Sequence, residues 1–414
     1  MTSNHTSEMY DVVIVGAGPA GTTAATFLQQ AGHRCLVLDK ATFPRYHVGE
    51  SLIPHTFGTL DRLGILPKLN ASHFPQKHSV RFVSPHGNQS DPFYFSETIE
   101  GSRAQTWQVV RSEFDQICLD NAIENGVETK MNTKVQQVLF QDGRAVGIRV
   151  QHGNENPHEI SAQVVIDASG SATLMGSQLG LKQHVPGLKK AAIWSYYKNG
   201  KRLEGLDAGE TTIFMIPKRG WFWYIPLPDN VVSVGLVANP DDLFHAGDNH
   251  EQVFLDYVEH CDPLKDRLNQ ASLDSPIRYI PTLAYRNSPT IGDGWIMIGD
   301  AAAFLDPIYS SGLFLALASA ELAANDIHEA LLEQNLSAKK IGAFTTPLAK
   351  GLNVIHRLIH AFYDPGFSFK KFLETFPQHR PALIDCLVGD VLFKNMTTFT
   401  NDLAQLTPPP PPLD

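Results

Sequence analysis

The sequence predicts an α/β fold with a Rossmann-like nucleotide-binding domain, an antiparallel β-sheet layer beside it and a C-terminal helical cap. The run DVVIVGAGPAG (11–21) joins a buried-strand pattern to a glycine-rich turn and a helix start. Runs such as AAIWSYYK (191–198) and NVVSVGLVA (230–238) are strand-like, and helical spacing of apolar residues returns after residue 345. With 414 residues, the chain has room for two closely joined domains.

These parts are expected to interleave along the chain, because strand and helix patterns alternate in blocks. The tail is a polyproline run, for which we expect an extended, poorly ordered chain. The predicted segments are a discontinuous nucleotide-binding domain at 1–77, 108–180 and 286–345, a β-rich substrate layer at 78–107 and 181–285, a C-terminal helical region at 346–407 and the Pro-rich tail at 408–414.

Within the nucleotide-binding domain, a strand at 11–16, a helix at 22–32 and a strand at 34–40 form a βαβ unit. A later hairpin turns at Asp-Gly (142–143), a strong turn signal between alternating strands. GWIMIGDAAAFLDPIYSSGLFLALASAELAANDIHEALL (294–332) predicts a strand, a loop and a long apolar helix.

Composition narrows the class of protein. The net charge of −10 and the lack of a basic run argue against nucleic acid as a partner. The start has no secretory signal pattern and the longest apolar stretch is too short and too polar to span a bilayer, so we expect a soluble protein without a membrane partner. Its scattered cysteines, with no C-x-x-C pair, favour buried free thiols and a reducing cytoplasm. We expect no metal, because His356 and His360 lack the glutamate of an H-E-x-x-H motif.

The glycine-rich turn predicts dinucleotide binding. Gly16, Gly18 and Gly21 stand at the G-x-G-x-x-G positions, where they allow a tight turn, close approach of a pyrophosphate and helix-on-strand packing. Asp39 ends the second strand about twenty residues on, where an acid binds ribose hydroxyls. A merely structural turn is the alternative interpretation.

Several motifs together resemble the FAD-dependent monooxygenase superfamily. They are G-x-G-x-x-G, the helix start Arg111-x-x-Phe114-Asp115, VVIDASG (164–170) and GWIMIGDAAAFLDP (294–307). Three further motifs, FPRYHVGESL (43–52), W-x-W-x-I-P (221–226) and F-x-x-P-x-x-S-x-G (304–312), are similar to those of the flavin-dependent halogenases, in their phenol, pyrrole or carrier-protein branch. The resemblance spans essentially the whole chain and includes AFYDPGFSF (361–369).

The resemblance implies FAD as the cofactor, used as FADH2 from a separate flavin reductase, with chloride or bromide as co-substrate. It places Asp300 beside the ribityl chain of the flavin. The implied cofactor-binding residues are Gly16, Gly18, Pro19, Ala20, Gly21, Asp39, Lys40, Arg45, Gly49, Glu50, Ser51, Arg111, Asp167, Gly299, Asp300, Pro307 and Gly312.

The resemblance also implies a catalytic lysine. In the family, hypohalous acid formed at the flavin travels to a lysine beside the aromatic substrate, and Lys77 matches that position. It acts either as an ammonium hydrogen-bonded to hypohalous acid or as a haloamine, and the sequence leaves both open. A lone lysine is more often a solvated surface charge. Here Lys77 follows a Phe-Pro pair and precedes an apolar strand, so we expect a desolvated setting.

The halide is expected at the backbone of Ser311 and Gly312, at a helix N-terminus. A tunnel wall is expected from Trp221, Trp223 and Pro226, with Phe304, Pro307 and Ser310 of the second motif. Core packing explains the tryptophans equally well, because residues 221 and 223 share one strand face. Tyr309 stands where the tryptophan halogenases carry glutamate, which disfavours tryptophan as the substrate.

The expected reaction is halogenation of an electron-rich aromatic such as a phenol or pyrrole, either free or tethered to an acyl or peptidyl carrier protein. An aromatic hydroxylase or a reductase on the same scaffold is the alternative, since fold alone does not fix chemistry. A flavoprotein that only binds a partner is a third hypothesis. A basic cluster is a candidate surface for an acidic carrier protein, with solvated strand ends as the commoner explanation; its members are Lys189, Lys190, Lys198, Lys201 and Arg202.

Overall fold

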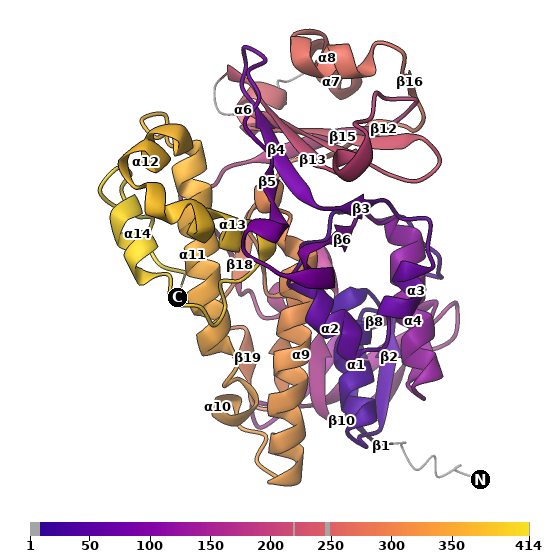
Figure 1. The fold of residues 1–414 in the computed structure, drawn as a ribbon. Coiled ribbons are helices and arrows are strands. Elements are labelled where there is room, and N and C mark those ends of the chain that lie inside the picture. The colour runs from indigo at the N-terminus through magenta and orange to yellow at the C-terminus, as the bar shows by residue number, and fades with distance from the viewer. Residues whose placement is uncertain (1–8, 218–219, 245–248, 414) are drawn as a thin grey trace, which may run out of the picture.

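The computed structural model describes residues 9–217, 220–244 and 249–413. Figure 1 shows a lower α/β part, an upper β-rich part with short helices above it, and a group of C-terminal helices beside both. Residues 1–8, where no secretory signal was expected, and Asp414 of the tail lie outside the described residues. In the described ranges, no helix has both the length and the apolar character needed to cross a membrane.

The first sheet contains the predicted nucleotide-binding strands. Its order is β19-β20-β10-β1-β2-β7, parallel except for the β19–β20 pair, and the β8–β9 hairpin pairs antiparallel with β10. The hairpin turns where predicted, because Asp142 and Gly143 both adopt positive φ, 50° and 82°. The strands are β1 (Met9–Val15), β2 (Cys35–Leu38), β7 (Glu128–Lys130), β8 (Thr133–Gln141), β9 (Arg144–His152), β10 (His158–Asp167), β19 (Ile291–Gly292) and β20 (Trp295–Met297).

Helices cover this sheet. The long helix α9 (Ser311–Leu332) packs beside α1 (Pro19–Gln30), and their contact is rich in alanine, including Ala20, Ala24, Ala316 and Ala320, so the helices approach closely. The other helices of this part are α2 (Thr56–Arg62), α3 (Leu66–Asn70), α4 (Arg111–Glu124) and α5 (Leu174–Gln178). Strand β20 and helix α9 thus complete a unit that begins with β1 at Met9, far away in the chain.

The second sheet runs in the order β16-β12-β15-β14-β13-β4-β5, with β17 beside β12. Its predicted strands are all present, and its pairs are antiparallel apart from β13 with β4, which is parallel. The strands are β4 (Ser79–Val83), β5 (Phe93–Tyr94), β12 (Ala191–Lys198), β13 (Thr211–Met215), β14 (Trp221–Pro226), β15 (Val231–Ala238), β16 (Ser272–Leu273) and β17 (Arg278–Ile280).

Each face of this sheet has its own hydrophobic core. Phe222 and Tyr224 pack with Phe254 and Leu264 of helices that the sequence analysis missed: α6 (Pro240–Leu243), α7 (His250–Glu259) and α8 (Asp262–Leu268). On the other face, Trp221 and Trp223 pack against the C-terminal helices. The alternation along β14 therefore sends its tryptophans toward one core and Phe222 and Tyr224 toward the other.

The C-terminal helical region is confirmed, with one break. Within the predicted helical region at 346–407, α13 ends at Val388 because Gly389 takes φ 91° and its space is filled by Ile53 and His55. The tail is extended but anchored rather than poorly ordered, since the Leu413 amide donates to Asn353 Oδ1 at 2.9 Å. The helices are α10 (Ala338–Ile341), α11 (Thr345–Tyr363), α12 (Phe369–Thr375), α13 (Arg380–Val388) and α14 (Thr397–Leu403).

Short strand pairs connect these parts. Strands β3 (Gln76–Lys77) and β6 (Thr106–Trp107) pair with each other, as do β11 (Lys182–His184), β18 (Tyr285–Asn287) and β21 (Ala303–Phe304) in a separate small sheet. Strand β3 lies between the lower and upper parts in Figure 1.

Candidate active site

The glycine-rich turn between β1 and α1 has room only for glycine at positions 16 and 21. A Cβ atom on Gly21 would lie 1.9 Å from the Gly16 carbonyl oxygen, and one on Gly16 would lie 2.3 Å from that of Ala168. Pro19 begins α1, whose first-turn amides lack partners within the helix. The turn therefore fits a dinucleotide pyrophosphate, because backbone and helix N-terminus are both open to an anion.

Asp39 lies directly beside this turn. Its Oδ2 accepts a hydrogen bond from the Ala17 amide at 2.9 Å, and its Oδ1 accepts one from the Ala41 amide at 2.8 Å. Half-buried, the carboxylate keeps free lone pairs that suit ribose hydroxyls. The neighbouring Lys40 is exposed.

The side chains of Arg111 and Arg45 bind Asp115 and the loop at 45–51, and do not line an open pocket. Arg111 binds Asp115 through two hydrogen bonds of 2.9 and 3.1 Å and donates to the Val48 carbonyl at 2.8 Å. Arg45 lies 3.2 Å from the same Asp115. Glu50, in the same loop, is buried and accepts from the Tyr196 hydroxyl at 2.5 Å, which ties the loop to β12 of the second sheet.

The two predicted acids near the flavin differ in what their carboxylates contact. Asp167 is fully buried, and its oxygens accept from the backbone amides of Ser169 and Met175 at 2.9 and 2.7 Å, so it holds the turn after β10. Asp300 follows Gly299 after β20, and burial raises the pKa of its carboxyl to about 6. Its carboxylate receives no hydrogen bond from the described part of the chain and is available to a ligand.

Lys77 is fully buried at the end of β3. Its Nζ donates to Ser51 Oγ at 2.8 Å and to the Leu52 carbonyl at 3.2 Å, and lies 5.6 Å from the centre of the Phe95 ring. No carboxylate within the described ranges balances its charge, and burial alone lowers the pKa of the amine to about 7. The expectation of a desolvated lysine is confirmed.

The neighbours of Lys77 place it between two cores. Phe95 belongs to the hydrophobic cluster that contains Trp221, Trp223 and Tyr309. Leu52, whose carbonyl accepts from Lys77, packs instead with Trp107, Leu313 and Leu317, where the two leucines lie in α9 just after the predicted halide residues. Lys77 is therefore surrounded by apolar groups on the side of the aromatic cluster and on the side of α9.

The tryptophans of β14 are held in fixed orientations. The Trp221 and Trp223 rings lie 6.2 Å apart, and each indole N–H has a partner: Trp223 donates to Ser233 Oγ at 3.0 Å and Trp221 to Tyr363 Oη at 2.8 Å. Pro226 ends the strand. The two rings pack in the hydrophobic core, as the core-packing interpretation requires. Through Tyr363, Trp221 is also connected to Asp306 in the 304–312 loop.

The loop at 304–312 is anchored by an acid that the sequence analysis did not single out. Asp306 Oδ1 accepts from the Ile308 amide at 3.0 Å, while its Oδ2 accepts from Tyr363 Oη at 2.9 Å. Burial raises the pKa of this carboxyl to about 7. The aspartate before a proline was visible in the motif, but its partner in α11 could not be read from sequence.

Beyond this anchor the chain turns into α9. Phe304 ends β21, Pro307 begins a single 3-10 turn, and Ser310 takes a left-handed conformation with φ 53°. Ser311 and Gly312 are the first residues of α9, so their amides stand in a helix turn that leaves them without intrahelical acceptors. This is the arrangement expected of an anion site at a helix N-terminus.

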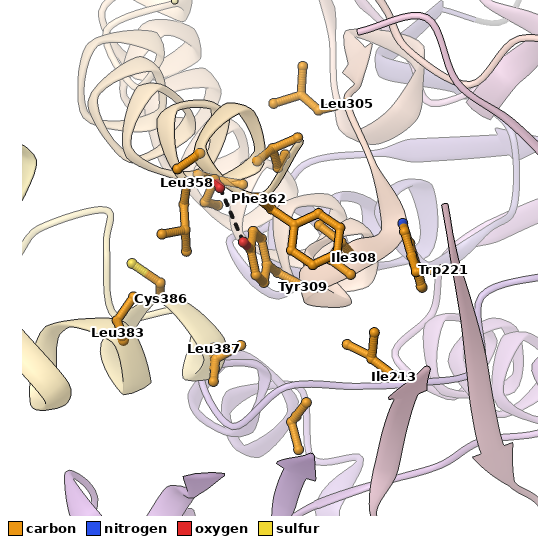
Figure 2. Close-up of a cluster of buried hydrophobic side chains, with 14 of the residues drawn as sticks. Ile213, Trp221, Leu305, Ile308, Tyr309, Leu358, Phe362, Leu383, Cys386 and Leu387 are labelled. Carbon is orange, nitrogen blue, oxygen red and sulfur yellow. Dashed lines mark hydrogen bonds between the residues drawn. The ribbon is translucent and has the colours of Figure 1, made fainter. Parts of the chain in front are cut away.

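Tyr309 is enclosed by apolar side chains. Figure 2 shows its ring among Ile308, Phe362 and Leu387, with a dashed line from its hydroxyl to the Leu358 carbonyl. That hydrogen bond is 3.2 Å long. Where the tryptophan halogenases carry glutamate, this chain therefore has a neutral, buried phenol.

The structure also places the histidine pair and the basic cluster. His356 is buried and its ring lies 4.6 Å from that of His360, and no group of metal ligands occurs in the described ranges. The basic cluster does not form one patch: Lys190 is buried and bonded to Asn239, Lys189 pairs with Asp241, and Lys201 pairs with Asp266 beyond the opposite end of β12.

Comparisons with known proteins identify the family of this chain. A family model described as "FAD binding domain" matches residues 9–220. A 1H-pyrrole-2-carbonyl-(peptidyl-carrier protein) chlorinase from Pseudomonas fluorescens is 31% identical over 403 residues, covering 92% of this chain and 89% of the relative. The corresponding brominase from Pseudoalteromonas luteoviolacea is 32% identical over 326 residues, covering 78% of each protein.

A tryptophan 2-halogenase from Chondromyces crocatus is 33% identical over 330 residues, 76% of this chain and 60% of the relative. Among solved structures, a flavin-dependent brominase aligns with a TM-score of 0.87 at 28% identity, covering 96% of this chain and 99% of the other. The chain therefore belongs to the flavin-dependent halogenases, which are FAD-dependent oxidoreductases.

Proposed function

We propose that this protein halogenates a pyrrole or phenol ring, free or carried as a thioester on a carrier protein, and that Lys77 delivers the halogen. The observation that carries the proposal is a fully buried lysine with no counter-ion among the described residues, held between Phe95, which belongs to the same hydrophobic cluster as the β14 tryptophans, and Leu52, which belongs to the cluster of Leu313 and Leu317 in α9. A lysine in such a place destabilises the fold, so a functional role accounts for it better than packing does.

The chain's own residues would hold the cofactor in three places. The turn from Gly16 to Gly21 would receive the pyrophosphate, Asp39 the ribose and Asp300 the ribityl chain. Arg111, Arg45 and Glu50 would act by fixing the 45–51 loop beside the flavin. When bound and reduced, FAD supplies with O2 the oxidising power that converts a halide into hypohalous acid. A flavin reductase is the proposed source of FADH2.

The start of α9 would bind the halide. The first-turn amides of Ser311 and Gly312 lie at the positive end of the dipole of a 22-residue helix, and this position favours binding of chloride or bromide. Trp221 and Trp223 would separate the flavin from the arene, so that only a small halogen oxidant passes. With the pKa of Lys77 near 7, both protonation states exist at neutral pH, and both modes of delivery stay open.

The substrate class rests on two arguments of different kinds. The relatives include enzymes named for pyrrole-2-carbonyl groups on a peptidyl carrier protein, which supports a pyrrole thioester. The neutral, buried Tyr309 lacks the charge of the glutamate in tryptophan halogenases, which argues for a ring already activated by its own heteroatom. Because a tryptophan 2-halogenase is also among the relatives, tryptophan belongs in the test.

The test incubates the protein with FAD, a flavin reductase, NADH, bromide and one probe at a time: a pyrrole-2-carbonyl carrier-protein thioester, free pyrrole-2-carboxylate, phenol or tryptophan. Mass spectrometry should find the bromine isotope doublet on the pyrrole or phenol probe. Oxygen addition that does not depend on bromide would support the hydroxylase alternative instead. Lys77→Ala should still bind FAD and oxidise FADH2 but yield no brominated ring, and full bromination by it would refute the role of Lys77.

A further inference from the structure

A buried chain of hydrogen bonds continues from Lys77 away from the aromatic cluster. Ser51 Oγ, which accepts from Lys77, lies 3.2 Å from Thr211 Oγ1. Gln108 Nε2 donates to Thr211 Oγ1 at 2.8 Å and to the Gly209 carbonyl at 2.9 Å. All of these side chains are buried, and none of the motifs in the sequence includes residues 108 or 211.

The orientation of the Gln108 amide is set at the far end of this hydrogen-bond network. The Gly209 carbonyl can only accept, so the Gln108 amide must present its nitrogen there, and the same nitrogen gives its second proton to Thr211. Gly209 is itself fixed, because a Cβ atom on it would lie 2.0 Å from the Gln76 carbonyl, one residue before Lys77. The anchor and the lysine are therefore held by one close backbone contact.

Thr211 Oγ1 accepts from Gln108 and can still either donate its proton to Ser51 or accept a second hydrogen bond from Ser51. Each hydroxyl can donate or accept, so the pair can face either form of Lys77. With the ammonium, Lys77 donates to Ser51 and Ser51 donates to Thr211. With the neutral amine, Thr211 donates to Ser51, whose proton then points to the nitrogen of Lys77. This hydrogen-bond network keeps the nitrogen of Lys77 in one place in both protonation states of the amine.

We propose that Thr211 and Gln108 are positioning residues for Lys77, acting through Ser51 to hold its nitrogen in one orientation toward the incoming halogen. This rests on the proposed function of Lys77. A purely structural alternative exists, since buried polar groups need partners in any fold. It predicts that loss of the Thr211 hydroxyl lowers stability and every activity together, whereas positioning predicts loss of halogen transfer alone.

The next residue of β13 provides a matched control. Thr212 is as buried as Thr211 but lies on the opposite face, where its hydroxyl accepts from Arg267 at 3.0 Å and donates to Glu210 at 3.2 Å. Thr211→Val and Thr212→Val make the same isosteric change on the same strand. Thr211→Ser keeps the hydroxyl and is the rescue variant.

The experiment measures brominated product per FADH2 oxidised, with the pyrrole-2-carbonyl carrier-protein thioester and phenol as probes, in wild type and the three threonine variants. Thr211→Val should lower this ratio about tenfold, the effect of one lost hydrogen bond at a reacting group. The KM for the probe, FAD binding and FADH2 oxidation should stay at wild-type values. Thr211→Ser should restore the ratio and Thr212→Val should leave it unchanged. Gln108→Met, which removes both N–H donors, should fall in the same way as Thr211→Val.

The outcomes separate the inference from the function on which it rests. If Lys77→Ala abolishes bromination but Thr211→Val keeps the wild-type ratio, the positioning role is wrong and the role of Lys77 stands. An equal fall in Thr211→Val and Thr212→Val, or no rescue by serine, assigns the hydroxyl a structural role and also overturns the inference. If Lys77→Ala brominates normally, both ideas fail.

Discussion

Replacing Lys77 by methionine should make the folded protein more stable near neutral pH while it abolishes ring halogenation. The reason is that burial lowers the pKa of the amine from 10.5 to about 7 in the folded protein. The unfolded chain therefore binds this proton more tightly. Across the window from about pH 7 to pH 10.5, the wild-type protein gains stability as the pH rises, and at or below pH 7 it carries the full cost of the buried ammonium.

The size of the effect follows from the two pKa values. One pH unit corresponds to about 1.4 kcal/mol, so the buried lysine costs about 4 kcal/mol at pH 7 and about 1 kcal/mol at pH 10. Methionine has a similar volume but leaves the Ser51 hydroxyl and the Leu52 carbonyl without their donor, which costs about 1–3 kcal/mol at either pH. The net gain for Lys77→Met should be about 1–3 kcal/mol at pH 7 and should fall by about 3 kcal/mol at pH 10.

Urea unfolding of the FAD-loaded protein at about pH 7 and pH 10 measures this directly. The exposed Lys339 provides the control, because Lys339→Met should change stability by the same small amount at both pH values. The change between the two pH values is the decisive quantity, since lost hydrogen bonds cancel in it. A stability difference between Lys77→Met and wild type that does not vary with pH would show that Lys77 is not a desolvated, unpaired amine.

Three other substitutions test the rest of the site. Gly21→Ala should abolish bound FAD, read from the flavin absorbance of the purified protein, because its Cβ would lie 1.9 Å from the Gly16 carbonyl. Tyr363→Phe removes the donor to Asp306 and the acceptor of Trp221, so the bromide KM should rise about tenfold, as for the loss of these two hydrogen bonds that hold the 304–312 loop. Burial raises the folded pKa of Asp306 from its unfolded value of 3.8 to about 7, so the stability of the wild-type protein falls as the pH rises from about 3.8 to about 7. The melting temperatures of Asp306→Asn at pH 5 and pH 8 should therefore differ less than those of the wild type. An Asp306→Asn protein that still loses stability over this window would refute the assignment of a buried, protonated carboxyl.

Local sequence patterns correctly predicted the elements that are determined by residues close together in the sequence. The β14 run was recognisable because its alternation matches two apolar faces, and the hairpin because Asp142 and Gly143 both require positive φ. Helix α7 was overlooked inside a strand-rich region, although Asn249 caps its N-terminus and Phe254 faces the core. There, short apolar stretches fit both periods, and only tertiary packing decides between them.

The sequence predicted the motifs of the candidate site but not the hydrogen-bond partners that connect them. The glycine turn lies in a recognisable local pattern, whereas Lys77 and the halide role of Ser311 and Gly312 were predicted through the resemblance to a family. Their partners come from segments far away in the chain, as when Tyr363 of α11 reaches Asp306, and no periodicity relates such positions. The anchored tail has the same origin, because its polyproline composition carries no information about Asn353 in α11.

The place of β20 in the first sheet has a consequence for biosynthesis. Until Trp295–Met297 leaves the ribosome, the edge of β10 that β20 will cover stays open, and Asp300, which follows β20 directly, is not yet in place. Nearly three quarters of the polypeptide must therefore wait, with an unprotected sheet edge, before the flavin can be captured. Nascent chains truncated before Trp295 are the ones that chaperones should hold longest.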